Sequence, residues 1–422
     1  MATARDGGAR LEVEVCVVGA GPVGATLAAA LAARGVRAAV VDAAPLPPME
    51  LPEFDGRAYA VARTSRPLLE SAGAWDRLPT APCAIREIRV SDGRPGEPAS
   101  RLRLHFSAEE SGVDAFGWMV EARALRVAIN AALPALPGLS VFAPARAAVV
   151  RRDAAGALLR LDDPGGTEVA ARLVVAAEGR GSPLRREAGI GTAGLDYRQT
   201  GIVLAVAHER PHRGVALEQF LPGGPFAQLP LSPTAEHADA SAIVWTERTG
   251  LARRFLAMDD AALSREVARR LGDHLGAARV IGRRWSYPLA ALQAQRYADT
   301  RLALVGDAAH GIHPIAGQGL NLGFRDAAQL ADLVAEAVAT GADPGSPALL
   351  ARYQAARRPD AMLMLGATHA LERLFGNDLA PIRLARRVGI AAVDRLPGLK
   401  RAFAARAMGL RADGGRAANP SA

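Results

Sequence analysis

The residues best suited to bind a large charged ligand form a glycine-rich segment near the amino end, GAGPVG, at positions 19–24. It lies between an apolar run, VEVCVV, and a stretch rich in Ala and Leu, an order that predicts strand, turn and helix. Gly19 permits the tight turn, Gly21 lets a pyrophosphate approach the backbone, and Gly24 lets the helix pack closely on the strand. Asp42 ends the next apolar run, where a carboxylate can bind a ribose. With that acid in register, a dinucleotide site is favoured over a purely structural glycine turn.

A second segment that could do chemistry is RLALVGDAAHGIHPIAGQGLNLGFRD, residues 301–326. It predicts a buried strand that ends in Gly306 and Asp307, then a turn rich in Gly and Pro, then a helix. Asp307 can accept hydrogen bonds from sugar-like hydroxyls, while Gly317 and Gly319 let the backbone come close to a flat ligand. The amides that open the helix favour negative charge, which a reduced flavin carries along its N1–C2=O edge. The segment therefore suits a flavin held between a strand end and a helix start.

Five further side chains are candidates for the same site. Glu178 closes the apolar run LVVAAEG, and is either a carboxylate near the dinucleotide and a visiting NAD(P)H or a solvated acid in a strand-end turn. Arg57 and Arg123 are candidate contacts to phosphate or flavin, because a guanidinium gives two directed hydrogen bonds; the alternative is a surface position. His310 and His313 lie in the second glycine-rich segment, where an acid/base role is less favoured than hydrogen bonds that order the loop.

The sequence holds one complete GxGxxG in a strand–helix context, so FAD is favoured as the resident dinucleotide and a nicotinamide cofactor would visit without a domain of its own. Cys16 lies in a predicted buried strand, and with Cys83 it makes no disulfide framework or metal-ligand spacing, so no metal is expected. We see no Ser-His-Asp arrangement, which argues against nucleophilic hydrolysis.

The net charge of +8 comes almost wholly from arginine, Lys400 being the single lysine. Aromatic residues make up 5% of the chain, and no Arg/aromatic tract that would stack bases is visible, so nucleic acid is not an expected partner. Attraction to an anionic membrane surface is more plausible. No secretory signal precedes the first predicted strand, which indicates a cytoplasmic protein.

The order of predicted elements indicates an α/β protein with three parts. Segments 1–84, 121–198 and 288–370 form a discontinuous Rossmann-like FAD-binding domain, and segments 85–120 and 199–287 form a mixed β-sheet domain over the substrate. Residues 371–422 form a helical C-terminal region with a polar tail. Residues 119–133 and 259–280 are expected to be helical. An alternative is that the β-rich insertions are edge hairpins of a single domain.

Four stretches together resemble the FAD-dependent aromatic hydroxylases of the para-hydroxybenzoate hydroxylase type. They are GAGPVGATLAAALA, the segment around Arg57, AAEGRGSPLR and GDAAHGIHPIAGQGLNLGFRDAAQLADLV. VALEQFLPGGPFAQLPLS, SAIVWTE and the C-terminal LERLFGNDLAPIRLARRVGIAAVDRLPGLKRAFAARAMGL are similar to the ubiquinone-biosynthesis hydroxylases within that group. The resemblance covers nearly the whole chain. One departure is Glu178, where the family has Asp before Gly, which puts the contact of that carboxylate in doubt.

The resemblance implies an NAD(P)H-dependent monooxygenase. Its reduced FAD would react with O2 to a C4a-hydroperoxide and transfer one oxygen atom to the ring of a polyprenylated phenol. Asp307, beside Gly306, would then hold the ribityl chain, while the 314–321 loop would face the isoalloxazine with Pro314, Gly317, Gly319, Leu320 and Asn321. No side chain is required as a catalytic acid or base; His313 and Pro314 are candidates because they face the flavin.

A prenylated substrate lies in or beside a membrane. The arginines Arg383, Arg386 and Arg387, with Ile382, Val393 and Leu396 near them, could form a peripheral membrane or partner surface, or a helix packed on the FAD domain with its arginines in water. A biosynthetic complex is a further candidate partner. Competing functions are a prenyl reductase or halogenase-like flavoprotein, and a non-catalytic flavin-binding scaffold.

Overall fold

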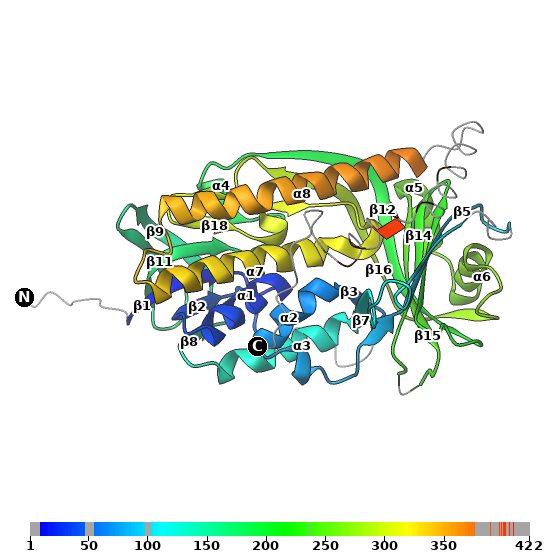
Figure 1. The fold of residues 1–422 in the computed structure, drawn as a ribbon, viewed down its shortest axis with the longest axis horizontal. Coiled ribbons are helices and arrows are strands. Elements are labelled where there is room, and N and C mark those ends of the chain that lie inside the picture. Colours follow the sequence, from blue (N-terminus) through cyan, green and yellow to red (C-terminus); the bar gives the residue numbers. More distant parts are fainter. Residues whose placement is uncertain are drawn as a thin grey trace, which may run out of the picture.

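The computed structural model describes residues 9–46, 55–97, 103–234 and 236–375. Beyond these it describes seven single residues, Gly389, Leu396, Gly398, Lys400, Arg401, Ala405 and Met408. Figure 1 shows an elongated molecule, with a sheet and long helices at one end and a sheet of long strands at the other. A third, small sheet lies between them. The expected α/β architecture is confirmed.

The first sheet is built around the strand that precedes the glycine turn. Its order is β17-β18-β11-β1-β2-β8, with β10 beside β11 and β9 beside β10. The strands are β1 (Arg10–Val18), β2 (Ala38–Val41), β8 (Leu139–Phe142), β9 (Ala147–Asp153), β10 (Gly156–Leu161), β11 (Glu168–Ala176), β17 (Ala298–Asp299) and β18 (Leu302–Leu304). β8, β2, β1, β11 and β18 run parallel, so their carboxyl ends meet at one edge, where ligands bind in such sheets. Cys16 is fully buried in β1, as expected.

Three long helices cover this sheet. α1 (Pro22–Ala33) connects β1 to β2, and α7 (Gln318–Ala339) packs beside α1 and α8 (Pro347–Phe375). Every residue from Gly24 to Ala32 is buried, because α1 lies between the sheet and other helices. In Figure 1, α8 runs from the first sheet toward the second. The helix α4 (Pro183–Glu187) follows β11.

The second sheet has the order β19-β16-β12-β15-β14-β13-β5-β6 and is antiparallel except between β13 and β5. Its strands are β5 (Glu87–Asp92), β6 (Arg103–Ser107), β12 (Thr192–His208), β13 (Val215–Leu221), β14 (Gly224–Pro230), β15 (Ala240–Arg248), β16 (Ala278–Ala294) and β19 (His310–Gly311). Helices α5 (Thr249–Leu256) and α6 (Asp260–Leu271) pack on one face through a core that includes Ile202, Phe226 and Trp245. The opposite face, here called the inner face, is turned toward the small sheet and the loop before α7.

The small sheet joins β3 (Ala58–Ala62), β7 (Gly117–Glu121) and β4 (Cys83–Ile85) in the order β3-β7-β4. Helices α2 (Arg66–Ser71) and α3 (Ala122–Ala132) follow β3 and β7. Short 3-10 helices complete the described structure: η1 (Arg63–Ser65), η2 (Trp75–Arg77), η3 (Leu133–Ala135), η4 (Gly306–Ala308) and η5 (Ile315–Gly317).

For two helices the predicted bound at one end is wrong. Residues 119–121 belong to β7 rather than to the following helix, because they pair with β3 and their apolar side chains are buried. The helix expected over 259–280 ends at Leu271, where Gly272 adopts a positive φ of 77°, and β16 begins at Ala278. In both places the apolar spacing suited either state, and pairing with a neighbouring strand decided it.

Several strands cross the expected domain boundaries. β12 spans the boundary at 198/199 and β16 spans the one at 287/288, while β7 belongs to the small sheet rather than to the larger covering sheet. The chain thus passes between the two ends of the molecule along continuous strands. The division into three domains stays a prediction.

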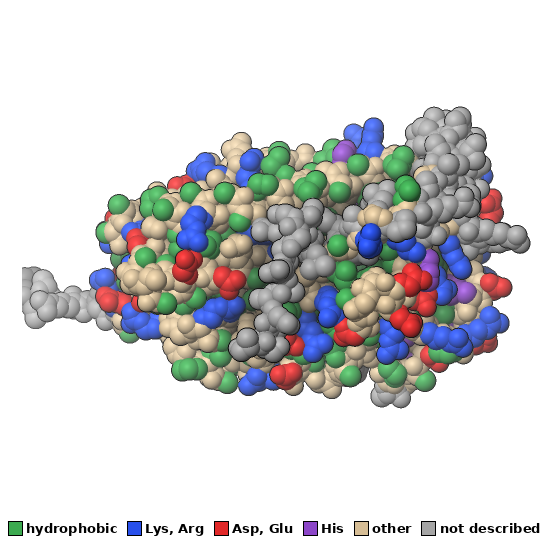
Figure 2. All heavy atoms as spheres, viewed as in Figure 1, with side chains coloured by type: hydrophobic (Ala, Val, Ile, Leu, Met, Phe, Trp, Pro, Cys, Tyr) green, Lys and Arg blue, Asp and Glu red, His purple; other side chains and the backbone are tan. Residues whose placement is uncertain are grey.

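Most of the expected C-terminal region lies outside the described residues, including Ile382, Arg383, Arg386, Arg387 and Val393. Leu396 is described and is 54% exposed. In the described part of the chain, no helix combines the length and the apolar character needed to cross a bilayer. On the face shown in Figure 2, basic and acidic side chains lie intermixed, so the positive net charge is not gathered into one field there.

Candidate functional site

The glycine turn after β1 has the geometry that its sequence predicts. Gly19 has a φ of 103°, and a β-carbon there would lie 2.5 Å from the Ala177 carbonyl oxygen. A β-carbon at Gly24 would collide with the Gly19 carbonyl oxygen, so both glycines are needed for close packing. A β-carbon at Gly21 would meet no described residue within 4 Å, so among these residues the backbone at Gly21 is open to an approaching group.

The first turn of α1 leaves its backbone amides available. Gly21 is the N-cap residue, Pro22 is the first helical residue, and no side chain caps the helix. The first amides of a helix have no partner within it, and the helix dipole favours negative charge there. An open backbone beside uncapped amides fits a pyrophosphate.

Asp42 lies one residue beyond β2, beside this turn. One carboxylate oxygen accepts a hydrogen bond from the Ala20 amide at 2.5 Å, and the other accepts one from the Ala44 amide at 2.8 Å. A carboxylate oxygen can accept a second hydrogen bond, so both oxygens can still receive a ribose hydroxyl. The side chain is half-buried and its place fits the predicted ribose contact.

The second glycine-rich segment meets the first. Gly306, with a φ of 57°, packs on Val23 in the first turn of α1, whose side chain would be 3.4 Å from a β-carbon at Gly306. The Asp307 carboxylate is half-exposed and lies 3.2 Å from the Arg180 guanidinium. The two turns therefore converge at the carboxyl edge of the first sheet, although nearly 300 residues separate them in the sequence. This convergence is what one FAD bound by both turns requires.

The loop from His310 to α7 is fastened at its far end to the small sheet. Gly317 has a φ of 60° and packs on Ala60, whereas a β-carbon at Gly319 would meet nothing within 4 Å. The Asn321 side chain donates to the carbonyl oxygens of Ala60 (2.7 Å) and Gly317 (3.2 Å) and accepts from the Ala62 amide (2.8 Å). Because its amide group is engaged by protein, Asn321 would hold the loop rather than touch a flavin with its side chain.

The remaining predicted loop residues lie between these ties. The Pro314 carbonyl oxygen accepts a hydrogen bond from the Gly317 amide at 2.9 Å, which closes a tight turn. Leu320 is partly buried and packs against the main core. Pro314 thus lies in the loop before α7, whereas Gly319, Leu320 and Asn321 lie in the first turn of α7, so the expected 314–321 loop ends at Gly317.

The near end of the loop is held by a buried charge network that the sequence analysis did not assign. Asp326 in α7 is fully buried and accepts hydrogen bonds from the Gly306 amide (3.0 Å), His310 Nε2 (2.5 Å) and Arg357 Nε (2.7 Å). These partners hold the pKa of Asp326 below its usual value, against the opposing effect of burial. His310 thus orders the loop, the role that the sequence favoured for it. The sequence did hold a signal for this network: Asp326 lies four residues from both Leu322 and Leu330, so a charged residue falls on the apolar side of α7.

His313 is fully buried but weakly bonded. Its Nε2 lies 3.4 Å from Gln199 Oε1, and its Nδ1 has no hydrogen-bond partner within the described residues. Its ring meets the Tyr197 ring edge to face, with centroids 5.0 Å apart. Burial lowers the pKa of His313 to about 4, so the ring is neutral near pH 7.

The two predicted arginines lie at the small sheet. Arg57 pairs with the buried Asp55 at 2.7 Å and covers the Trp285 ring at 4.2 Å from its centroid. Arg123, in the first turn of α3, lies 3.7 Å from Glu121. Its Nε is buried without a hydrogen-bond partner in the described parts of the chain, so it is available to a bound group.

Another arginine, which the sequence analysis missed, contacts the glycine turn. Arg126 in α3 is buried and donates to the Ala20 carbonyl oxygen at 2.5 Å. Its spacing of three residues from Arg123 places both on neighbouring positions of one helix face, which was the signal available. Arg126 therefore supports the turn from the side of α3.

Glu178 has local partners. Its carboxylate accepts a hydrogen bond from Ser182 Oγ at 2.5 Å and one from the Leu184 amide at 3.3 Å, at the start of α4. Burial raises its pKa above the usual value. The observed contacts are those of a helix-capping carboxylate, and the role beside a dinucleotide stays a prediction.

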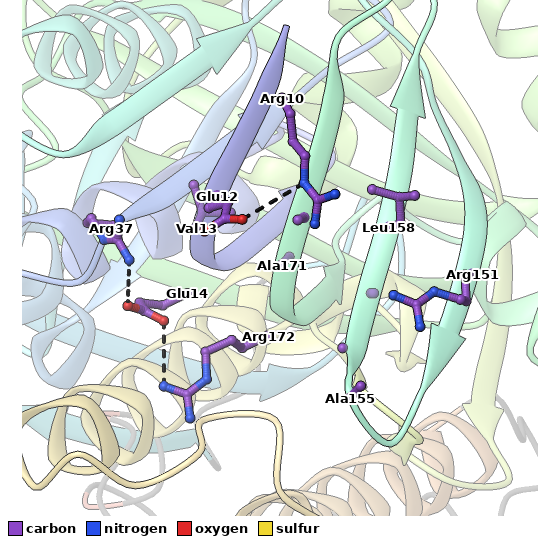
Figure 3. Close-up of a pocket in the computed structure, with 13 residues that line it drawn as sticks. Arg10, Glu12, Val13, Glu14, Arg37, Arg151, Ala155, Leu158, Ala171 and Arg172 are labelled. Atoms are coloured by element: carbon purple, nitrogen blue, oxygen red, sulfur yellow. Dashed lines mark hydrogen bonds and ion pairs between the residues drawn. The ribbon is translucent and has the colours of Figure 1, made fainter. Parts of the chain in front are cut away.

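A separate pocket lies at the amino end of β1, lined by charged side chains (Figure 3). Glu14 pairs there with Arg37 at 3.1 Å and with Arg172 at 3.7 Å, and Arg10 pairs with Glu12 at 3.8 Å. Its volume is about 200 Å³. From Arg10 to the glycine turn the strand rises about 30 Å, so this pocket is at the opposite edge of the sheet from the converging turns.

Comparison with known proteins agrees with the geometry. The model of a family described as FAD binding domain matches residues 12–368. The chain is 50% identical over 404 residues to the ubiquinone hydroxylase UbiL of Rhodospirillum rubrum, covering 96% of this chain and 91% of that protein. It is 34% identical over 400 residues to the 3-demethoxyubiquinol 3-hydroxylase of Escherichia coli, covering 94% and 98%.

Solved structures share the fold. The structure of pqsL, a probable FAD-dependent monooxygenase from Pseudomonas aeruginosa, has 26% sequence identity and a TM-score of 0.70, covering 90% of this chain and 99% of that chain. The p-nitrophenol 4-monooxygenase PnpA from Pseudomonas putida, at 20% identity, has a TM-score of 0.74 and covers 96% and 99%. With the open Gly21 backbone, the uncapped α1 and the family match, the chain belongs to the FAD-binding family that includes the ubiquinone-biosynthesis hydroxylases, and it is an FAD-dependent monooxygenase.

Proposed function

We propose that the protein uses FAD, NAD(P)H and O2 to hydroxylate the aromatic ring of a polyprenylated phenol in ubiquinone biosynthesis. The observation that carries this proposal is the contact between Gly306 and Val23, which brings the two glycine-rich turns to one place. The ubiquinone hydroxylase named among the relatives, matched over 96% of this chain, supports the substrate class.

Different residues of the site would bind different parts of the cofactor. The turn from Gly19 to Gly24 and the first amides of α1 would hold the pyrophosphate, and Asp42 would hold the ribose. Asp307 would receive the ribityl hydroxyls, and the segment from Pro314 to Asn321, which includes the first turn of α7, would face the flavin ring. Bound FAD supplies the electron transfer and oxygen chemistry, which the protein alone lacks.

The protein itself would position the cofactor and keep water out of the site. Asp326 and Asn321 fix the two ends of the loop and would thereby fix the part of the site that faces the flavin. That face is mostly apolar, with Ala205, Ala216 and Ala242 buried in it. An apolar wall keeps water from the reacting centre and suits a hydrophobic phenol.

A direct experiment measures FAD, NAD(P)H oxidation and O2 uptake together. Purified protein should be yellow, and a short-chain 2-prenylphenol should increase both NAD(P)H oxidation and O2 uptake and yield a product heavier by one oxygen atom. A prenyl reductase would oxidise NAD(P)H without O2 uptake, and a scaffold would bind FAD without oxidising NAD(P)H. Deletion of the gene should cause a quinone precursor lacking one ring hydroxyl to accumulate.

We further propose that the protein meets its substrate on the cytoplasmic face of a membrane, alone or within a biosynthetic complex. A prenylated phenol partitions into lipid, and the net charge of +8 favours an anionic surface. Flotation with anionic liposomes at low and high salt tests this proposal. Binding that is lost in salt supports it, and absence of binding at low salt contradicts it.

A further inference from the structure

A carboxylate stands in the middle of the inner face of the second sheet. Glu218 is in β13 between Ala216 and Phe220, and alternate residues of a strand share one face. Ala216 packs with the small sheet, and Phe220 packs with Ile315 of the loop before α7. Glu218 therefore points toward the side of the sheet where the loop and the small sheet lie, away from α5 and α6.

Its neighbours across the sheet are apolar. Val90 of β5 and Ala227 of β14 are its direct partners in the two ladders, within about 5.5 Å at Cα. Phe220, two residues along the strand, is about 7 Å away on the same face. Its ring stacks on Phe375 of α8, with centroids 3.7 Å apart, and it shares a hydrophobic cluster with Ile315. Glu218 therefore lies beside this cluster, which includes Ile315 of the segment before α7.

The Glu218 carboxylate has no hydrogen-bond or ion-pair partner among the residues that the structure describes. The residue is only half-buried, as are Val90, Leu229 and Val244 on the same face. These four side chains therefore keep accessible surface on the inner face of the sheet. An unpaired carboxylate in apolar surroundings is costly, and a hydroxyl-bearing ligand would relieve that cost.

Burial alone raises the pKa of Glu218, to about 7. The elements around this face carry other titratable side chains, namely Asp92, Tyr197, Tyr287, His313, His369 and Glu372. None of them contributes to the raised pKa of Glu218. Near pH 7 the group is thus divided between its acid and carboxylate forms.

We propose that Glu218 binds the hydroxyl group of the substrate's aromatic ring and accepts its proton. This inference rests on the proposed function for the identity of the substrate. The phenolic O–H bond breaks, the proton forms a new O–H bond on a Glu218 oxygen, and the electron pair stays on the phenolate. The phenolate is the more electron-rich ring and is therefore more readily hydroxylated. A base whose pKa is close to the working pH is the most effective one.

The test follows the ionisation of a bound phenol, which requires no turnover. Flavin-loaded protein is titrated with 4-nitrophenol, whose phenolate has its own absorbance, and difference spectra are recorded from pH 5 to pH 9. The variants are Glu218→Gln, Glu218→Asp and the control Glu87→Gln, which removes a carboxylate from the opposite face of the same sheet. Flavin content and thermal unfolding are recorded for each variant.

Wild-type protein and Glu87→Gln should bind nitrophenol with the same ionisation profile. Glu218→Asp should keep a profile that depends on a carboxyl group, but with a smaller fraction of the bound probe ionised. Glu218→Gln should bind the probe largely as neutral phenol and should slow the hydroxylation of a 2-prenylphenol by about 100-fold near neutral pH. An unchanged profile in Glu218→Gln, or no binding of the probe to wild-type protein, overturns the proposal.

Failure of the proposed function gives a different pattern from failure of this inference. If only the proposed function is wrong, wild-type protein should ionise bound nitrophenol through Glu218 but should oxidise no NAD(P)H with any phenol. If Glu218→Gln does not fold, the comparison of Glu218→Asp with wild-type protein decides, because a shortened side chain should weaken probe ionisation without affecting flavin content.

Discussion

Substitution of Asp326 by Asn tests the charge network that holds the flavin-facing loop. Both carboxylate oxygens accept hydrogen bonds, one from Arg357 and the other from the Gly306 amide and His310. The side-chain amide of Asn has only one accepting atom, its oxygen. Its NH2 group would therefore face either Arg357 or the Gly306 amide and His310, which are themselves donors. The side chain and that of Arg357 are almost completely buried, so water cannot replace the lost acceptor.

The size of the effect follows from burial. Removing one partner of a buried ion pair costs about 3–5 kcal/mol, because the other charge stays buried without compensation. For 422 residues the entropy of unfolding is about 0.9 kcal/mol/K, at roughly 2.1 cal/mol/K per residue. The melting temperature of Asp326→Asn should therefore fall by about 3–6 °C. FAD should bind more weakly as well, since Gly306 loses an anchor.

The assay is thermal unfolding with and without added FAD, together with the flavin absorbance of the purified variant. Asp332→Asn is the matched control, because Asp332 lies in the same helix, is 64% exposed and, within the part of the chain that the structure describes, pairs with Arg34 alone. It should cost less than about 1 kcal/mol. If Asp326→Asn melts at the same temperature as Asp332→Asn, the network does not stabilise the loop and the reasoning is refuted.

Three other predictions concern the same region. Gly24→Ala should lower the melting temperature through collision with the Gly19 carbonyl, whereas Gly21→Ala should leave it unchanged and weaken only FAD binding; equal melting temperatures would contradict the packing argument. Asp307→Ala should yield folded but colourless protein, since its side chain is half-exposed, and full flavin content would remove it from the site. In the folded protein the pKa of His313 is lowered from 6.5 to about 4, so as the pH falls below 6.5 the unfolded state binds a proton that the folded state does not. The free energy of unfolding should therefore be about 2 kcal/mol lower at pH 5 than near pH 7. Urea unfolding near pH 7 and pH 5 should show a smaller difference in His313→Gln, and an equal difference would contradict burial as the cause.

The two turns were predictable because their requirements are local. A tight turn needs Gly19 and close packing needs Gly24, and each turn directly follows a short apolar run, residues 15–18 in one case and 302–305 in the other. The Asp326 network was not predictable in the same way, because its partners lie between 16 and 31 residues away and meet it only after α7 and α8 pack.

Glu218 shows a second reason for a missed residue. Alternation along β13 separates two faces, but the sequence does not specify which face is covered by α5 and α6 and which is turned toward the loop. The same ambiguity made residues 119–121 look helical, since an apolar residue can be buried in either state and only the strand partner decides. The residues that form a turn can thus be predicted from the sequence, whereas which face of a strand other elements cover cannot.

The long strands β12 and β16, which pair along most of their 17 residues each, have a consequence for protein engineering. They belong to both ends of the molecule, so neither end can be expressed alone without cutting a hydrogen-bonded ladder and leaving open edges prone to aggregation. A chimera that exchanges substrate preference between relatives should therefore join its segments in loops and inherit both strands as a pair from one parent.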